Sequence, residues 1–346
     1  MKKMLFKALC SGVVASLALT ACSKPEADAS ASSKTDASAS TEKSLKPFHF
    51  LTNWYAEAEH GGYYQAKAKD FYKDAGLDVT IQMGGPQVNN YQLLGAKKAD
   101  CAIGADIATL NAISQGVGVT TVATAFQKEL IVLIAHDDVS KIEQLKDKTL
   151  LIDSVSMSSW YPWFKAKYGL DDATVKPYTF NIQPFMVNKD YVQQGYFSSE
   201  PYALEQAGAK FKVFFLSDYD YPSYGNAVVC RTDVIQERPE EVKAFLAATM
   251  KGWKSYLEDS KAGDALIFKD NPQMTQGQID YAIDKIKQHQ FVTGGDAATM
   301  GIGIITPERM KVIHQMSVDL GLIDATKAPL EKFYDDRFIK EIKEMP

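Results

Sequence analysis

The sequence has few cysteines and histidines, and neither type is clustered. Four cysteines occur in 346 residues, and the five histidines are scattered over the chain as His49, His60, His136, His289 and His314. Zinc sites and iron–sulfur clusters need cysteines or histidines at short, regular spacing. The sequence therefore predicts no metal centre and no other cofactor.

Basic residues are neither in excess nor gathered into a run. The chain has 38 lysines and arginines against 43 acidic residues, a net charge of −5, and arginine is so scarce that the first is Arg231. Proteins that bind nucleic acids usually carry a basic stripe or patch. We therefore expect no nucleic-acid partner.

Long apolar runs are absent after the first 21 residues, so no later segment is expected to span a membrane. Residues 1–7 contain three lysines, an apolar run reaches Leu19, and Leu19-Thr20-Ala21-Cys22 follows. This pattern predicts a lipoprotein signal peptide over residues 1–21, cleaved before Cys22. Acyl chains such as palmitate on Cys22 would anchor the protein on the extracytoplasmic, periplasmic side of a bacterial membrane. The alternative is an ordinary secretory signal in which Cys22 is incidental.

Residues 22–46 lack aromatic side chains and are rich in alanine, serine, lysine and acidic residues. Such a segment cannot bury enough apolar surface to fold, so it predicts a flexible tether. Removal of the three lysines before Cys22 would change the net charge from −5 to −8.

The remaining residues are too many for a single hydrophobic core of ordinary size, so two lobes are expected. Short β-like runs alternate with helical patterns, which predicts an α/β protein with mostly parallel sheets. The strands are expected at residues 48–52, 78–83, 101–104, 120–126, 131–136, 149–152, 175–179, 196–199, 211–215 and 225–231. A helix is expected to begin at Pro239 and to bear one apolar face, made by Val242, Phe245, Leu246, Thr249, Trp253 and Tyr256.

Residues 53–64 form the most distinctive loop, because they follow a predicted strand and precede a predicted helix. Ligands of open α/β sheets bind at the carboxyl ends of the strands. Trp54 and Tyr55 offer rings for stacking, and Glu59 and His60 offer polar contacts. We interpret this cluster as a ligand site. The alternative is that the aromatic residues cap the core and His60 is solvated.

A serine-rich loop, residues 153–159, follows the predicted strand at 149–152 and opens a helix at Trp160. Its free backbone amides and hydroxyls are expected to receive an anionic or carbonyl group. Simple helix capping is the alternative.

These features together resemble a known family. The segment ending at Cys22, the loop 53–64 with residues 69–79, the strand 99–104 and the helix start 239–245 are similar to substrate-binding proteins of bacterial ABC importers. The resemblance is to the nitrate, sulfonate and taurine type, which includes binders of thiamine-pyrimidine precursors. It implies a two-lobed, type II periplasmic-binding-protein fold with hinge crossovers near residues 136–141 and 221–226.

The resemblance also implies the domain organisation and partners. The first lobe would comprise residues 47–137 and 225–346, with the return strand and C-terminal helices in the later part, and the second lobe residues 138–224. The protein would be a monomer that carries a small solute to a permease and its ATPase, without an enzymatic step. A lipid-anchored sensory or adhesive module is an alternative from another class.

An enzymatic branch, the fungal thiamine-pyrimidine synthases, uses a lysine, a histidine and a cysteine-rich run. The matching positions here are Gly104, Ala108 and residues 221–225, which contain no cysteine. The lysine and thiols that such chemistry requires are therefore missing, which makes a synthase the weaker alternative.

In the binding branch, Glu200 matches a carboxylate that contacts the pyrimidine, although it could also be a helix-capping acid. Acidic and aromatic loops favour a flat, nitrogen-bearing ligand, and sulfonate, taurine or nitrate is the alternative. The expected ligand-binding residues are Asn53, Trp54, Tyr55, Glu59, His60, Gly85, Pro86, Asp106, Ser154, Ser156, Ser158, Trp160, Glu200 and Tyr224.

Cys101 and Cys230 both fall in strands expected in the first lobe. In the resembled fold the return strand runs beside the third strand, so the two residues could form a disulfide. The alternative is that they are two buried thiols.

Overall fold

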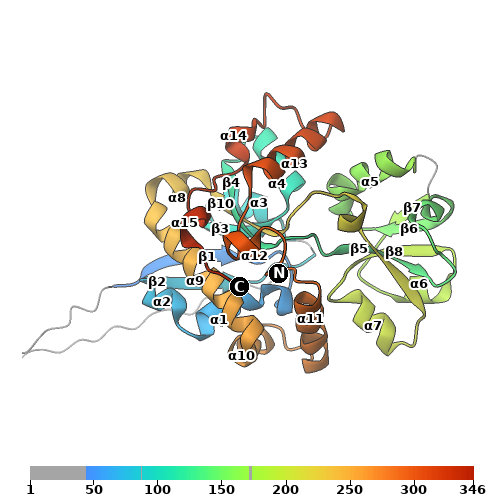
Figure 1. Cartoon of the computed structure of the whole chain (residues 1–346), viewed down its shortest axis with the longest axis horizontal. Helices are drawn as coiled ribbons and strands as arrows, with labels where there is room; N and C mark the ends of the chain where they lie inside the picture. The colour runs from blue at the N-terminus through green and yellow to red at the C-terminus, as the bar shows by residue number, and fades with distance from the viewer. Residues whose placement is uncertain (1–43, 87, 171–173) are drawn as a thin grey trace, which may run out of the picture. The chain divides into compact units, whose positions relative to one another are not determined.

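The computed structural model describes residues 44–86, 88–170 and 174–346 (Figure 1). The expected signal peptide, Cys22 and nearly all of the expected tether lie outside the described residues. Within the described part, the strands form two five-stranded sheets flanked by helices, as the α/β pattern predicts. We call the part of the chain built on each sheet a lobe.

The first sheet has the strand order β2-β1-β3-β10-β4. It comprises β1 (Lys46–Leu51), β2 (Leu77–Gln82), β3 (Cys101–Gly104), β4 (Val119–Phe126) and β10 (Gly225–Arg231). Buried and exposed residues alternate strictly along β2, which is the period of a strand with one face on the core. All eight residues of β4 are buried, because structure covers both of its faces.

Helices from both ends of the chain cover the first sheet. They are α1 (Gly61–Ala68), α2 (Phe71–Asp74), α3 (Asn90–Gly95), α4 (Asp106–Ser114), α8 (Thr232–Glu237), α9 (Pro239–Glu258), α10 (Lys261–Asp270), α11 (Gln276–Gln288), α12 (Ala297–Met300), α13 (Pro307–Asp319), α14 (Leu330–Phe333) and α15 (Ile339–Ile342). The predicted apolar face of α9 is confirmed, since Phe245, Leu246 and Trp253 are buried. A Cβ at Gly252 would collide with the carbonyl oxygen of Gly62, so glycine permits the close packing of α9 on α1.

The second sheet has the order β7-β6-β8-β5-β9. It comprises β5 (Ile131–His136), β6 (Thr149–Ile152), β7 (Thr174–Pro177), β8 (Tyr191–Tyr196) and β9 (Phe211–Phe215), with α5 (Trp160–Tyr168), α6 (Gln183–Val187) and α7 (Glu200–Gln206) around it (Figure 1). The strand predicted at 196–199 is wrong: residues 197–199 turn the chain into α7. The true strand β8 was missed because it contains Gln193 and Gln194, two polar residues that the structure buries.

Each sheet has four strands in one direction and one antiparallel strand, which agrees with the mostly parallel sheets expected. In the first sheet β1 is parallel to β2 and β3, but β10 is antiparallel to β3 and β4. In the second sheet β6 is parallel to β7 and β8, but β5 is antiparallel to β8 and β9. The antiparallel strand in each sheet is the one by which the chain enters after crossing from the other lobe.

The first crossover lies earlier in the chain than expected. Strand β5 pairs only with strands of the second sheet, so the chain leaves the first sheet through residues 127–130 rather than 136–141. The expected lobe boundary after residue 137 therefore moves to this segment. The second crossover, residues 220–224, joins the 3₁₀ helix η4 (Leu216–Tyr219) to β10, which agrees with the expected position.

Cys101 and Cys230 lie directly opposite each other on β3 and β10. The structure joins them in a disulfide, so the alternative of two free buried thiols does not hold. The bond links the return strand to the sheet built from the first part of the chain.

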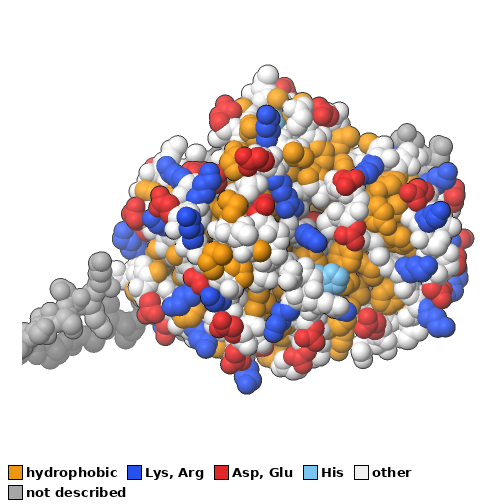
Figure 2. All heavy atoms as spheres, in the orientation of Figure 1, with side chains coloured by type: hydrophobic (Ala, Val, Ile, Leu, Met, Phe, Trp, Pro, Cys, Tyr) orange, Lys and Arg blue, Asp and Glu red, His pale blue; other side chains and the backbone are white. Residues whose placement is uncertain are grey.

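Charges of both signs are interspersed on the face drawn in Figure 2, which shows no single-sign stripe. None of the helices in the described ranges has the length and apolarity to cross a membrane. These same ranges contain no group of three or more histidine, cysteine or acidic residues suited to a metal ion.

Candidate functional site

The loop after β1 is held to the turn after β2. The Thr52 hydroxyl donates to the Trp54 carbonyl at 2.7 Å, and the Gly84 amide donates to the Thr52 hydroxyl at 3.1 Å. A Cβ at Gly84 would lie 2.5 Å from the Thr52 carbonyl oxygen, so a larger residue would push the two segments apart. Gly85 lies beside the Tyr55 ring, which brings two predicted site residues together, whereas Pro86 faces solvent.

Two aromatic rings from different lobes meet at this loop. The Trp54 ring lies 4.6 Å from that of Phe180, which follows β7 in the second lobe. The side chains of Phe180 and of the loop residue Tyr55 are each 45% exposed, so a ligand can reach these two rings. Phe180 also has a φ of 58°, a left-handed conformation that is unusual for a bulky residue and is often found at functional sites.

Three carboxyl groups of the two lobes, those of Glu57, Glu59 and Glu200, lie close enough to interact electrostatically. Burial is the main cause that raises the pKa of each, to about 7 for Glu59 and well above the ordinary value for Glu57. The negative charges of Glu59 and Glu200 raise the pKa of Glu57 further. The Ser198 hydroxyl donates to Glu59 and so connects the second lobe to the first.

Glu200 is the first residue of α7, and its carboxylate accepts hydrogen bonds from residues that precede this helix. The Tyr178 hydroxyl donates to one oxygen at 2.9 Å, and the Tyr196 amide donates to the other at 2.7 Å. Tyr178 also lies 5.2 Å, ring to ring, from Phe180. The carboxylate is therefore fixed beside the exposed aromatic group.

A partly buried hydrogen-bond network joins the loop to β8 and β10. The Asn53 amide accepts from the His60 Nε2–H at 2.9 Å and donates to Asn226 at 3.4 Å. Asn226 also accepts from the Tyr196 hydroxyl at 3.2 Å and donates to the Glu59 carbonyl at 3.2 Å. Burial lowers the pKa of His60 to about 3, so its imidazole is neutral rather than a solvated or cationic group.

The serine-rich loop differs from the expected receptor. The Asp153 carboxylate accepts hydrogen bonds from the amides of Val155 and Ser156, and from the Ser156 hydroxyl at 2.6 Å. These donors are therefore occupied, because an aspartate before a turn bonds to the amides that follow it. Ser154 and Ser158 are exposed.

Three other predicted residues lie away from the aromatic group. Trp160 is fully buried and packs against Phe164 and Tyr161, so its expected stacking role is not available in this structure. Tyr224 is also buried, and its amide donates to Asp106 at 2.9 Å. Asp106 and Tyr224 thus contribute to the second crossover.

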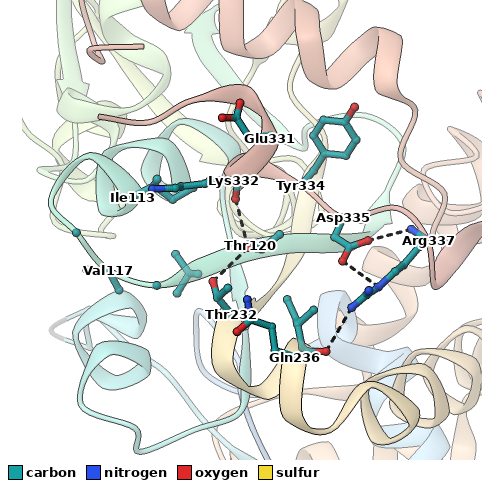
Figure 3. A pocket seen from close by; sticks show the side chains of 14 residues that line it. Ile113, Val117, Thr120, Thr232, Gln236, Glu331, Lys332, Tyr334, Asp335 and Arg337 are labelled. Carbon is teal, nitrogen blue, oxygen red and sulfur yellow. Dashed lines mark hydrogen bonds and ion pairs between the residues drawn. The ribbon is translucent and has the colours of Figure 1, made fainter. Parts of the chain in front are cut away.

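A different hollow, of about 570 Å³, lies at the start of β4, at the end of that strand remote from the crossover. Figure 3 shows that Arg337 lies against Asp335 and the Ile235 carbonyl, and that Thr120 lies between Thr232 and the Lys332 carbonyl. Its polar groups are largely bonded to one another. The aromatic residue that lines this groove is Tyr334, which is partly exposed.

Several residues of the site were not in the sequence-based set. Phe180 directly follows an expected strand, so its position at a strand end was a usable signal. No local signal marks Ser198 or Asn226, since their roles arise only when distant segments meet. Tyr178 and Tyr196 likewise gain significance from their contacts with Glu200 and Asn226.

Comparisons with known proteins agree with this architecture. Residues 57–262 match the family model described as NMT1/THI5 like. The chain is 24% identical to the riboflavin-binding protein RibY of Chloroflexus aurantiacus, over 80% of this chain and 81% of that one. It is 23% identical to the formylaminopyrimidine-binding protein of Halalkalibacterium halodurans, over 64% and 69% of the two chains.

Among solved structures, the periplasmic aliphatic sulphonate-binding protein SsuA of Escherichia coli matches with a TM-score of 0.63 at 12% identity, covering 85% of this chain and 93% of that chain. The periplasmic nitrate-binding protein NrtA of Synechocystis PCC 6803 matches with a TM-score of 0.58 at 14% identity, over 86% and 88%. These similarities show the fold. The chain therefore has a periplasmic-binding-protein fold and belongs to the NMT1/THI5-like family.

Proposed function

We propose that this protein is the solute-binding component of an ABC importer. It captures a small, flat, nitrogen-bearing solute similar to a thiamine-pyrimidine precursor between its lobes and delivers it to the permease. The observation that supports this most directly is the pair of rings, Trp54 and Phe180, contributed by different lobes beside the fixed carboxylate of Glu200. The riboflavin- and formylaminopyrimidine-binding relatives agree with a flat heterocyclic ligand.

The charge of the site favours a neutral or cationic ligand. Glu59 and Glu200 lie close enough to Glu57 for their charges to raise its pKa, and Glu200 likewise raises the pKa of Glu59. A carboxylate accepts hydrogen bonds from an exocyclic amine, while an aromatic side chain stacks on the heterocycle. These three residues offer a sulfonate or nitrate ion no positive charge, and the amides of Val155 and Ser156 in the serine-rich loop are bonded to Asp153.

Capture follows from contacts that only a closed arrangement provides. In this structure the lobes already meet through Trp54 and Phe180, through Ser198 and Glu59, and through the Asn111 amide and the Ser158 carbonyl. A ligand that adds contacts to both lobes stabilises this arrangement over an open one. The closed form then presents its surface to the permease.

No covalent step is part of this proposal. Gly104 and Ala108 stand where the synthase branch has a lysine and a histidine, and residues 221–225 contain no cysteine. A side chain able to form a Schiff base at those positions is therefore missing.

Membrane attachment through Cys22 completes the proposal. Lipidation would keep the binding protein close to its permease, since two or more acyl chains give stable anchoring. Cys22→Ser should move the protein from the membrane to the soluble fraction. Unchanged membrane association of this variant would contradict the anchor.

The ligand is tested by thermal denaturation of the chain from residue 22 onward, carrying Cys22→Ser. Formylaminopyrimidine and riboflavin should raise the melting temperature, because a ligand at 100 times its Kd stabilises the folded state by about 2.7 kcal/mol. Glu200→Gln should abolish the shift, and Glu143→Gln, an exposed matched control, should preserve it. A shift with alkanesulfonates, taurine or nitrate alone would overturn the ligand class, and no shift with any solute would contradict the proposal.

A further inference from the structure

Arg309, in the first turn of α13, binds both crossovers at once. Its Nε donates to the Pro222 carbonyl at 2.6 Å, and its two terminal nitrogens donate to the Gln127 carbonyl at 2.7 Å and the Ser223 carbonyl at 2.8 Å. The guanidinium also lies over the Tyr224 ring, 3.9 Å from its centroid. Only arginine offers several donors in a fixed planar fork.

The two crossovers are in direct contact at this point. A Cβ on Gly225 would lie 2.8 Å from the Lys128 carbonyl oxygen and 3.1 Å from the Phe126 Cβ, so there is room only for hydrogen. The Thr124 hydroxyl donates to the Gly225 carbonyl at 2.7 Å. A movement of one crossover must therefore displace the other.

Further bonds hold this junction to the first lobe. The Gln127 side chain donates to the Ile304 carbonyl at 2.9 Å, and the Thr306 amide donates to the Tyr224 hydroxyl at 3.0 Å. The Tyr224 amide donates to Asp106 on α4. Each crossover is thus fixed at its first-lobe end, next to β4 and β10.

Arg309 also compensates two buried carboxyl groups: Glu129, which lies within the first crossover, and Asp106, which is bonded to the second. Asp106 receives the Tyr224 amide, and Glu129 receives the amides of Leu130 and Ile131 at 2.8 Å and 3.3 Å. Burial raises the pKa of Asp106 to about 6 and that of Glu129 to about 7, while the charge of Arg309 opposes both changes. Without Arg309, neither carboxyl group would have this positive charge beside it.

We propose that Arg309 is a positioning residue that couples the two crossovers, so that the lobes close about a single axis. The inference rests on the proposed function, in which closure captures the solute. With Arg309 in place, both crossovers bend beyond the same fixed junction. Without it, each crossover bends independently and the lobes also twist relative to each other.

The test measures the distance between the lobes in the chain from residue 22 onward, carrying Cys22→Ser. Spin labels are attached at Lys69→Cys in the first lobe and Asp190→Cys in the second, both exposed positions, while the native disulfide remains closed. Without ligand, pulsed electron–electron double resonance should give a narrow distribution of the distance between the two spin labels. Arg309→Met should broaden it by about twofold, because two independent hinges permit more orientations.

Arg309→Lys is a second variant. It keeps the positive charge, so it tests the three simultaneous hydrogen bonds of Arg309 separately from its charge. It should also broaden the distribution, since one ammonium group cannot reach the three carbonyls in the same planar geometry. Arg337→Met is the matched control, because Arg337 pairs with Asp335 in the groove of Figure 3 and contacts neither crossover. It should leave the distribution unchanged.

An unchanged distribution in folded Arg309→Lys would overturn the inference, as would equal broadening in Arg337→Met. Addition of formylaminopyrimidine tests the proposed function separately, because this ligand should shorten the distance between the two labels in the wild-type protein. The width without ligand tests the coupling by Arg309. Either result can therefore fail while the other holds.

Discussion

The carboxyl groups beside the loop after β1 and those around the groove of Figure 3 have opposite electrostatic surroundings. Glu59 is buried and Glu57 is partly buried, other acids lie nearby, and the pKa values of both are raised. At the groove, Asp335 pairs with Arg337 at 3.1 Å. Asp233, next to the lining residue Thr232, pairs with Arg231 and Lys97, both at 2.8 Å, and these partners lower its pKa.

This difference separates structural from functional acids. An acid that serves stability is usually paired, because an unpaired buried charge is costly. Acids held without a cation, with perturbed pKa values and next to exposed aromatic rings, are typical of binding sites. The comparison therefore favours the interlobe site over the groove as the place where a ligand binds.

The largest effect is expected for the stability of Glu59→Gln. An acid whose folded pKa, about 7, exceeds its unfolded value near 4.5 destabilises the fold as pH rises between these values. The amide cannot ionise and can still accept the Ser198 hydrogen bond, so the variant should be more stable than wild type above pH 7, by up to about 3 kcal/mol. The difference should vanish near pH 4.

Urea denaturation at pH 4, 6 and 8 would measure these free energies of unfolding. A variant less stable than wild type at pH 8 would show that Glu59 is a compensated structural acid, like those at the groove. Glu205→Gln, an exposed residue of α7, is the control and should follow the wild-type curve.

The next effect concerns ligand affinity and the two aromatic rings. Trp54→Ala should weaken formylaminopyrimidine binding by about tenfold, since an aromatic stacking contact is worth about 1 kcal/mol or more. Phe180→Ala should have a similar effect, because its ring lies 4.6 Å from that of Trp54. Isothermal titration calorimetry would measure both dissociation constants.

Arg337→Ala is the corresponding change in the groove, and it should leave this affinity unaltered. If Arg337→Ala weakened binding while Trp54→Ala did not, the groove would be the ligand site and the comparison would be reversed.

The sequence predicted those parts of the fold that depend on local patterns. Alternating apolar residues located β2, and the proline at position 239 with its spaced apolar residues located α9 and its buried face. The loop containing Trp54 and Tyr55 was found because strand ends carry ligands in α/β proteins. Each of these signals lies within a short stretch of the chain.

The rest required contacts between distant segments. The lobe to which β5 belongs depends on its pairing with β8 and β9, which its own apolar residues do not specify. Asn226 joins the site through Asn53 and the Glu59 carbonyl, far away in the sequence. Asp153, in contrast, is adjacent to the serines, and its occupation of their amides could have been inferred from the common turn that aspartate forms.

The smallest effect is expected for Asp233→Asn, beside the groove. Its ion pairs are partly exposed, so their loss should destabilise the fold by no more than about 1 kcal/mol at pH 7. Because the folded pKa of Asp233 is lowered, this contribution is present above the unfolded value near 3.8 and disappears as pH falls. Urea denaturation at pH 7 and pH 3 should therefore show a difference that decreases on acidification, opposite in sign to that of Glu59→Gln. High salt should also reduce it, since exposed pairs are screened. A stabilising Asp233→Asn at pH 7 would mean that this acid too is uncompensated, and the electrostatic distinction between the two regions would fail.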